Sequence, residues 1–226
     1  MLDSGPATWH NSCTVTSYPM SKLSMGREVR RILLAVAAVL MLLVTGSVQA
    51  AEPSPEDFLR GRHEALTAIL GQPKSPIREK RVLAAIDEVF DYGELAKRSL
   101  GDEWKNRSPD EQKQFQELLE GLVRQSYRKS VDSTLGWGVD YRGKVAKEQG
   151  IVVTTVAKHK SDSRKSPVSV DYTLIQVDGK WRVCDVIIEG SSLVSNYRSQ
   201  FTKIIKKKGF AELLSKMKSK LAKGDG

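Results

Sequence analysis

Asp185 and Glu189 are the two residues of this chain whose spacing comes closest to that of a catalytic pair. They stand four positions apart in and just after a segment rich in β-branched residues, so a strand would present both carboxylates on one face. Inside a small cavity, such a pair could act as general acid and general base. One interpretation of the chain is therefore a small cavity-type α+β enzyme.

A structural interpretation of the same residues is favoured. The two acids fall where the strand runs into a helix, and ion pairs to Arg198 would brace that turn, as would Asn196. An acid/base site usually also has neighbours in a pocket that perturb its pKa values, and the sequence identifies none. We therefore expect Asp185, Glu189, Asn196 and Arg198 to stabilise a turn, and we predict no enzyme.

The other candidate patterns for chemistry are weak. His63 falls in a helix predicted to lie on the surface and His159 lies near a polar loop, and neither belongs to a metal-binding or nucleophile pattern. Residues 138–144 have the glycine and lysine spacing of a phosphate-binding loop, but Val145 stands where that loop needs Ser or Thr. No catalytic residue, metal site or cofactor is predicted.

The first fifty residues are predicted to be an upstream segment followed by a cleavable signal peptide. Three arginines precede an unbroken apolar run over 32–44, and small residues follow it. The run of 13 residues is short for a helix that must cross a hydrocarbon core of about 30 Å. Cleavage is expected before Ala51, which predicts export to the periplasm; an uncleaved membrane anchor is the alternative.

Residues 51–226 are predicted to form a single domain whose fold rests on packing. Cys184 is the only cysteine in this range, so no internal disulfide is expected. The whole chain has 36 Lys plus Arg and 27 Asp plus Glu, of which residues 1–50 hold four and two, so the mature charge is +7. Lysines crowd the C-terminal region, either as a solvated face or to attract an anionic membrane surface or an acidic partner. No nucleic-acid partner is expected, because no aromatic platform accompanies the lysines.

The hydrophobic periodicity predicts an α+β domain with N-terminal helices, a four-stranded antiparallel sheet and C-terminal helices. Short connections between the strands favour a meander, and Asp178-Gly179 is a hairpin signal. Helices are expected over 56–70, 76–90, between Asp91 and Gly101, from Ser108 onward, from Leu193 onward and beyond Gly209. Strands are expected over 139–147, 151–159, 167–177 and 180–189.

The last predicted strand and the helix after it hold a distinctive series of residues: Trp181, Val183, Asp185-Val186, Glu189-Gly190, Ser192-Leu193-Val194, Asn196-Tyr197-Arg198 and Gln200-Phe201. A second pattern is Leu-Gly-x-x-Trp at 100–104. In both, the chain resembles the MlaC-type family of periplasmic phospholipid-shuttling proteins, also called toluene-tolerance or Ttg-type proteins. The resemblance covers about residues 55–221 and implies a curved sheet enclosed with helices around an apolar, lipid-holding cavity.

The resemblance implies a carrier that moves phospholipid between an outer-membrane lipoprotein complex and an inner-membrane ABC transporter complex with an MCE-type subunit, supporting outer-membrane lipid asymmetry and solvent tolerance. A hopanoid-pathway carrier and an adaptor with a filled core are alternatives. Taken singly, each expected lipid contact is as well explained by an ordinary core, and only the resemblance assigns it to a cavity. These contacts are Tyr127, Val153, Tyr172, Leu174, Val186, Ile188, Leu193 and Tyr197.

Overall fold

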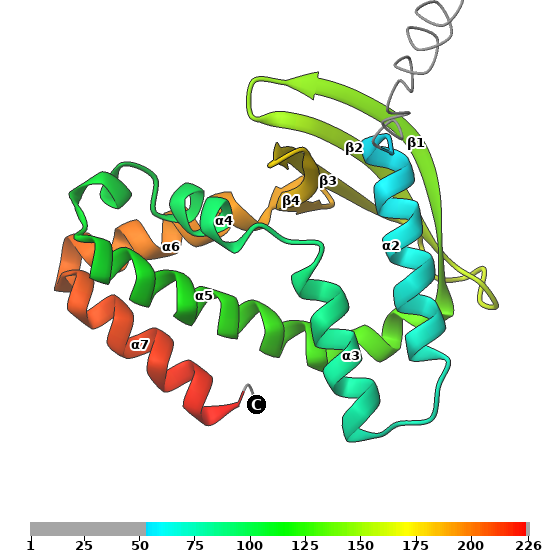
Figure 1. Cartoon of the computed structure of the whole chain (residues 1–226), viewed down its shortest axis with the longest axis horizontal. Helices are drawn as coiled ribbons and strands as arrows, with labels where there is room; N and C mark the ends of the chain where they lie inside the picture. The colour runs from blue at the N-terminus through cyan, green and yellow to red at the C-terminus, as the bar shows by residue number, and fades with distance from the viewer. Residues whose placement is uncertain (1–52, 225–226) are drawn as a thin grey trace, which may run out of the picture. The chain divides into compact units, whose positions relative to one another are not determined.

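A computed structural model of the chain describes residues 53–224 (Figure 1). The signal peptide predicted within residues 1–50 lies outside the described residues. The described part begins with helices α2 (Pro55–Leu70), α3 (Pro76–Asp87), α4 (Tyr92–Leu100), η1 (Gly101–Asn106), α5 (Pro109–Ser130) and η2 (Val131–Gly136). It continues with strands β1 (Trp137–Lys147), β2 (Gly150–His159), β3 (Val168–Val177), β4 (Lys180–Ile188) and β5 (Ser191–Ser192), and ends with α6 (Leu193–Lys208) and α7 (Phe210–Lys223).

The α+β class and the antiparallel meander are confirmed. The strands are hydrogen-bonded in the order β1-β2-β3-β4-β5, and every neighbouring pair is antiparallel. The sheet has five strands where four were predicted, because Ser191 and Ser192 pair with the end of β4 before α6 begins. Ser192 also caps α6, since its Oγ accepts a hydrogen bond from the backbone N–H of Ser195 at 3.0 Å.

Two irregularities bend the sheet. One extra residue stands in β1 at Arg142, between the paired Tyr141 and Gly143, and another stands in β4 at Cys184, between the paired Val183 and Asp185. Such bulges add one residue to one strand and increase its local bend and twist. Figure 1 shows the result as a long arched β1–β2 hairpin beside α2.

Local sequence signals set most element boundaries. Ser108 and Glu111 form a reciprocal capping box at the start of α5, where Pro109 occupies the first helical position. Asp178 and Gly179 have φ of 50° and 74°, as the tight hairpin between β3 and β4 requires. Each of these features follows from residues within one turn of the chain, so the sequence could predict it.

The predicted helix over 76–90 was too long at its C-terminal end. It ends at Asp87, and the chain then runs beside β4: the N–H of Val183 donates to the carbonyl of Val89 at 2.8 Å, and the N–H of Asp91 donates to the carbonyl of Val183 at 2.9 Å. Pairing with the free side of β4 replaces the last helical turn. This places Phe90 against the sheet, where it is 5% exposed.

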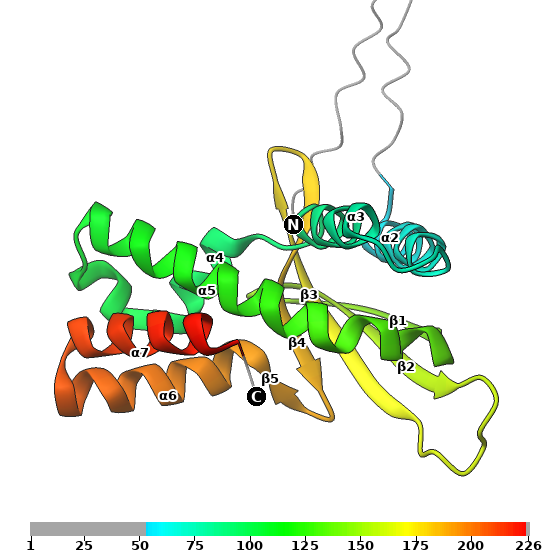
Figure 2. The same ribbon diagram turned by 90° about the horizontal axis from the view of Figure 1, so that it is seen from below.

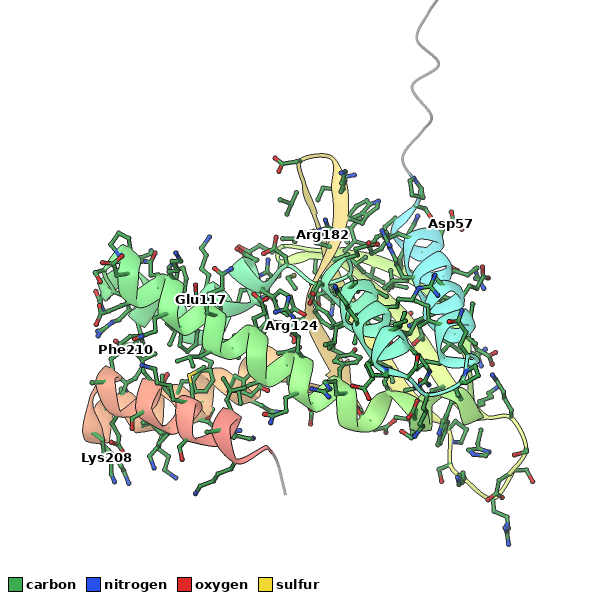
Figure 3. All side chains as sticks on the ribbon, turned by 60° about the horizontal axis from the view of Figure 1, so that its bottom comes forward. Asp57, Glu117, Arg124, Arg182, Lys208 and Phe210 are labelled. Atoms are coloured by element: carbon green, nitrogen blue, oxygen red, sulfur yellow. The ribbon has the colours of Figure 1, made fainter. Side chains whose placement is uncertain are left out.

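The helices form two groups. α2 and α3 lie side by side, whereas α6 and α7 form an antiparallel pair at the opposite end of the described part (Figure 2). α5 runs from that pair toward the start of β1 (Figure 2). Arg124 on α5, labelled in Figure 3, forms a bidentate ion pair with Asp87 of α3, at 2.8 and 2.6 Å. None of the helices in residues 53–224 combines the length and hydropathy needed to cross a bilayer.

Candidate ligand-binding cavity

A cavity of about 320 Å³ lies between the inner face of the sheet and the helices α2, α3, α5 and η2. Its volume falls at the lower end of the range of about 300–1,000 Å³ found for ligand pockets. Most of the lining is apolar or aromatic: Leu59, Leu66, Ala85, Ile86, Val89, Phe90, Tyr127, Val131, Trp137, Val139, Ala157, Val170, Tyr172, Val186 and Ile188. Arg62, His63, Thr67, Ser133, Thr134 and Thr155 complete it.

The strand register places the sheet side of this lining on one face. Tyr172 is opposite Val186 across β3 and β4, and Val170 is opposite Ile188 two positions along. Residues directly opposite each other in an antiparallel pair point to the same side of the sheet. Val186 is 8% exposed and Ile188 is 51% exposed, so the cavity opens toward the end of β4.

Four of the eight predicted contacts line this cavity and four do not. Tyr127, Tyr172, Val186 and Ile188 border it. Val153 and Leu174, both 0% exposed, lie in the close-packed core. Leu193 and Tyr197 pack against the core from α6, where the ring of Tyr197 stacks on that of Phe201 with centroids 5.3 Å apart.

His63 was expected on the surface, and the structure corrects this. It projects from α2 toward the sheet, where Nδ1 lies 2.6 Å from the hydroxyl of Tyr141 and Nε2 lies 3.3 Å from that of Tyr172. The spacing of His63 from Leu59 and Leu66, four and three positions away, puts it on the apolar face of α2. That spacing was the signal that sequence reasoning overlooked.

The histidine and tyrosine side chains that line the cavity are neutral at pH 7. Burial lowers the pKa of His63 below its usual 6.5, raises the pKa of Tyr127 to about 12, and raises the pKa of Tyr172 further. Arg62 is the lining residue that carries a charge, and it is ion-paired with Glu88. The interior of the cavity therefore favours the apolar part of a ligand.

A second hollow, of about 460 Å³, lies between α3, α5 and η2 and has a different character. Asp132 accepts from Arg78 at 2.5 Å and from Lys74 at 2.7 Å, and Glu79 pairs with Arg128 at 3.0 Å. Because every charged residue of this lining is already ion-paired, this hollow is a weaker candidate for a ligand.

Residues 62–219 match the protein family described as MlaC protein, which is more than half of the chain. The chain belongs to the MlaC family. Its fold is similar to the solved structure of a phospholipid-binding protein from Ralstonia solanacearum in complex with a phospholipid, with a TM-score of 0.64 and 21% sequence identity. The alignment covers 74% of this chain and 96% of the Ralstonia chain. No curated protein matches the chain.

The turn residues of this MlaC-family chain lie outside the cavity. Asp185 accepts hydrogen bonds from the hydroxyl of Ser192 at 2.6 Å and from the N–H of Val194 at 3.1 Å, which joins β4 to the start of α6. Glu189 accepts from the N–H of Ser169 at 2.5 Å. Neither carboxylate lines the cavity, so the geometry provides no support for an enzyme that uses them there.

The expected ion pairs of Arg198 are replaced by backbone contacts. Its Nε and Nη2 both donate to the carbonyl of Arg98, at 2.8 and 2.7 Å, which ties α6 to the end of α4. Asn196 is exposed on α6. Within residues 53–224, no group of three or more His, Cys, Asp or Glu side chains is arranged to hold a metal ion.

We predict that His63 makes stability depend on pH. Its folded-state pKa lies below the unfolded value of about 6.5, so below pH 6.5 the unfolded chain binds more protons and stability falls as the solution becomes more acidic. The loss is at most about 1.4 kcal/mol per pH unit for one group. Urea unfolding at pH 7.5 and 5.5 should show a smaller difference in His63→Gln than in the parent protein. An identical difference in both would contradict this role.

Proposed function

We propose that this MlaC-family protein is a periplasmic carrier that holds phospholipid acyl chains in the 320 Å³ cavity. The observation that carries the proposal is the cavity itself, with an apolar lining and a single charged residue that is already paired. The family and the phospholipid complex of the similar Ralstonia structure support this choice of ligand. Binding of this kind requires no covalent chemistry.

The energetics favour the tails over the head group. A buried CH₂ group contributes about 0.8 kcal/mol, so two acyl chains have on the order of 20 kcal/mol to gain from leaving water. Arg62 is held by Glu88, which leaves no free cation in the lining for a phosphate. We place the head group at the open side of the cavity, near exposed Thr67 and Ile188, in contact with water.

The proposed pathway runs between two membranes. After removal of the predicted signal peptide, the protein would exchange lipid with an outer-membrane lipoprotein complex and with an inner-membrane ABC transporter complex that has an MCE-type subunit. Membership of the MlaC family supports this assignment. The proposed role is maintenance of outer-membrane lipid asymmetry, with solvent tolerance as its consequence.

Lipid analysis of the purified protein tests the proposal. The chain from Ala51 onward, exported to the periplasm of a bacterial host, should yield about one phospholipid per molecule by native mass spectrometry and by solvent extraction. Loading the emptied protein with phospholipid and with hopanoid in competition then tests the lipid class. A protein that purifies without lipid and takes up none would be an adaptor, and exclusive uptake of hopanoid would replace the proposed ligand.

A further inference from the structure

The net charge of the mature chain resides on the α6–α7 pair. Residues 51–192 hold 23 Lys plus Arg and 23 Asp plus Glu, so their net charge is zero. Across α6 and α7 the single acid is Glu212, whereas the bases are Arg198, Lys203, Lys206, Lys207, Lys208, Lys216, Lys218, Lys220 and Lys223. Charge of one sign is thus gathered at one end of the described part, where Figure 3 labels Lys208.

Six of these lysines are available to a partner, and all eight are exposed. Lys216 lies 3.6 Å from Glu212, and Lys203, Lys206–Lys208, Lys218 and Lys223 make no ion pair with any residue in 53–224. Arg198 is held by the carbonyl of Arg98.

The eight exposed lysines of α6 and α7 form a lysine surface, and its composition distinguishes a protein partner from a lipid bilayer. Protein interfaces are enriched in aromatic residues and Arg and depleted in Lys. Here every available cation is Lys, and the aromatic rings of Phe201 and Phe210 are each 6% exposed, turned into the core. The ammonium group of Lys is strongly hydrated, so it is better suited to diffuse attraction to many negative charges than to bidentate recognition of one carboxylate.

We infer that α6 and α7 dock this protein on the surface of an anionic lipid bilayer. Clusters of four to eight basic residues on a helix bind anionic head groups, and each Lys near such a surface strengthens binding about fivefold. No residue of α6 or α7 lines the cavity, so the docked protein keeps its cavity free. This docking goes beyond the proposed function and would hold whatever ligand the cavity carries.

Vesicle binding by the exported mature chain tests the inference. Co-sedimentation should show binding to vesicles of phosphatidylcholine with 30% phosphatidylglycerol, and little binding to phosphatidylcholine alone. Raising the salt to 0.5 M should release the protein, because screening shortens the reach of these charges. The triple variant K206Q/K207Q/K208Q should bind the anionic vesicles on the order of 100-fold more weakly.

A matched control separates position from charge. The variant K144Q/K147Q/K180Q removes the same charge from exposed positions on β1 and β4 and should bind like the parent. Circular dichroism must show both variants folded, since Lys206–Lys208 also lie at the C-terminal end of α6, where cations stabilise the helix.

Three results would overturn docking to a membrane. Equal binding to both vesicle types, or equal loss in the two triple variants, would remove the role of the lysine surface. Binding to a poly-glutamate matrix without binding to vesicles would assign that surface to an acidic protein. Extracted lipid should be the same in the parent and in both variants, so loss of docking is distinguishable from loss of cavity binding.

Discussion

Ile188→Asp is expected to reduce the lipid bound by the purified protein at least tenfold while leaving the fold intact. Ile188 lines the cavity at its open side, and it is 51% exposed, so its side chain contributes little to the core. A carboxylate at this position must be desolvated or protonated before an acyl chain can lie against it. The same change also removes the apolar contacts of the isoleucine, each CH₂ of which is worth about 0.8 kcal/mol.

Val145→Asp is the matched control for this variant. Val145 is also a β-branched strand residue and is 55% exposed, but it lies on β1 outside the cavity lining. Native mass spectrometry of both variants should therefore show lipid loss in Ile188→Asp alone. Full lipid occupancy in a folded Ile188→Asp protein would mean that the acyl chains lie elsewhere.

Phe115→Ala is expected to produce the largest loss of stability, about 3–5 kcal/mol. Phe115 is 0% exposed at the centre of the helical core, with its ring 5.4 Å from that of Phe201 and 6.2 Å from that of Phe210. Truncation leaves a void among rings that three helices hold in place, so the space cannot easily close. For a domain of this size the melting temperature should fall by roughly 6–20 °C.

The comparison for Phe115→Ala is Ile77→Ala. Ile77 is 73% exposed on α3, and its truncation should change the free energy of unfolding by less than about 0.5 kcal/mol. Urea unfolding followed by circular dichroism measures both variants, and an unchanged slope shows that the loss lies in the folded state. A loss below 1 kcal/mol for Phe115→Ala would mean that the helical core is loosely packed.

Only half of the predicted contact residues line the cavity, and Val153 and Val186 show why. Both are apolar strand residues that point to the same side of the sheet as Tyr172. One is completely buried in the core and the other borders a void, and the same side chain serves either environment. The pattern along a strand identifies its inward face, but it does not indicate which part of that face a helix covers.

Features that depend on neighbours in the chain could be predicted from the sequence alone. The capping box at Ser108, the hairpin at Asp178-Gly179 and the alternation along the strands predicted the α+β order, and the residues from Trp181 to Phe201 carried the resemblance to the family. The places where distant segments meet became known only from the folded structure. It turned His63 toward Tyr141 and Tyr172, moved Val89 out of a helix to pair with β4, and gave Arg198 a carbonyl in place of a carboxylate. These contacts join residues that are between 78 and 109 positions apart in the sequence. Contacts over such separations depend on how the helices pack on the bent sheet.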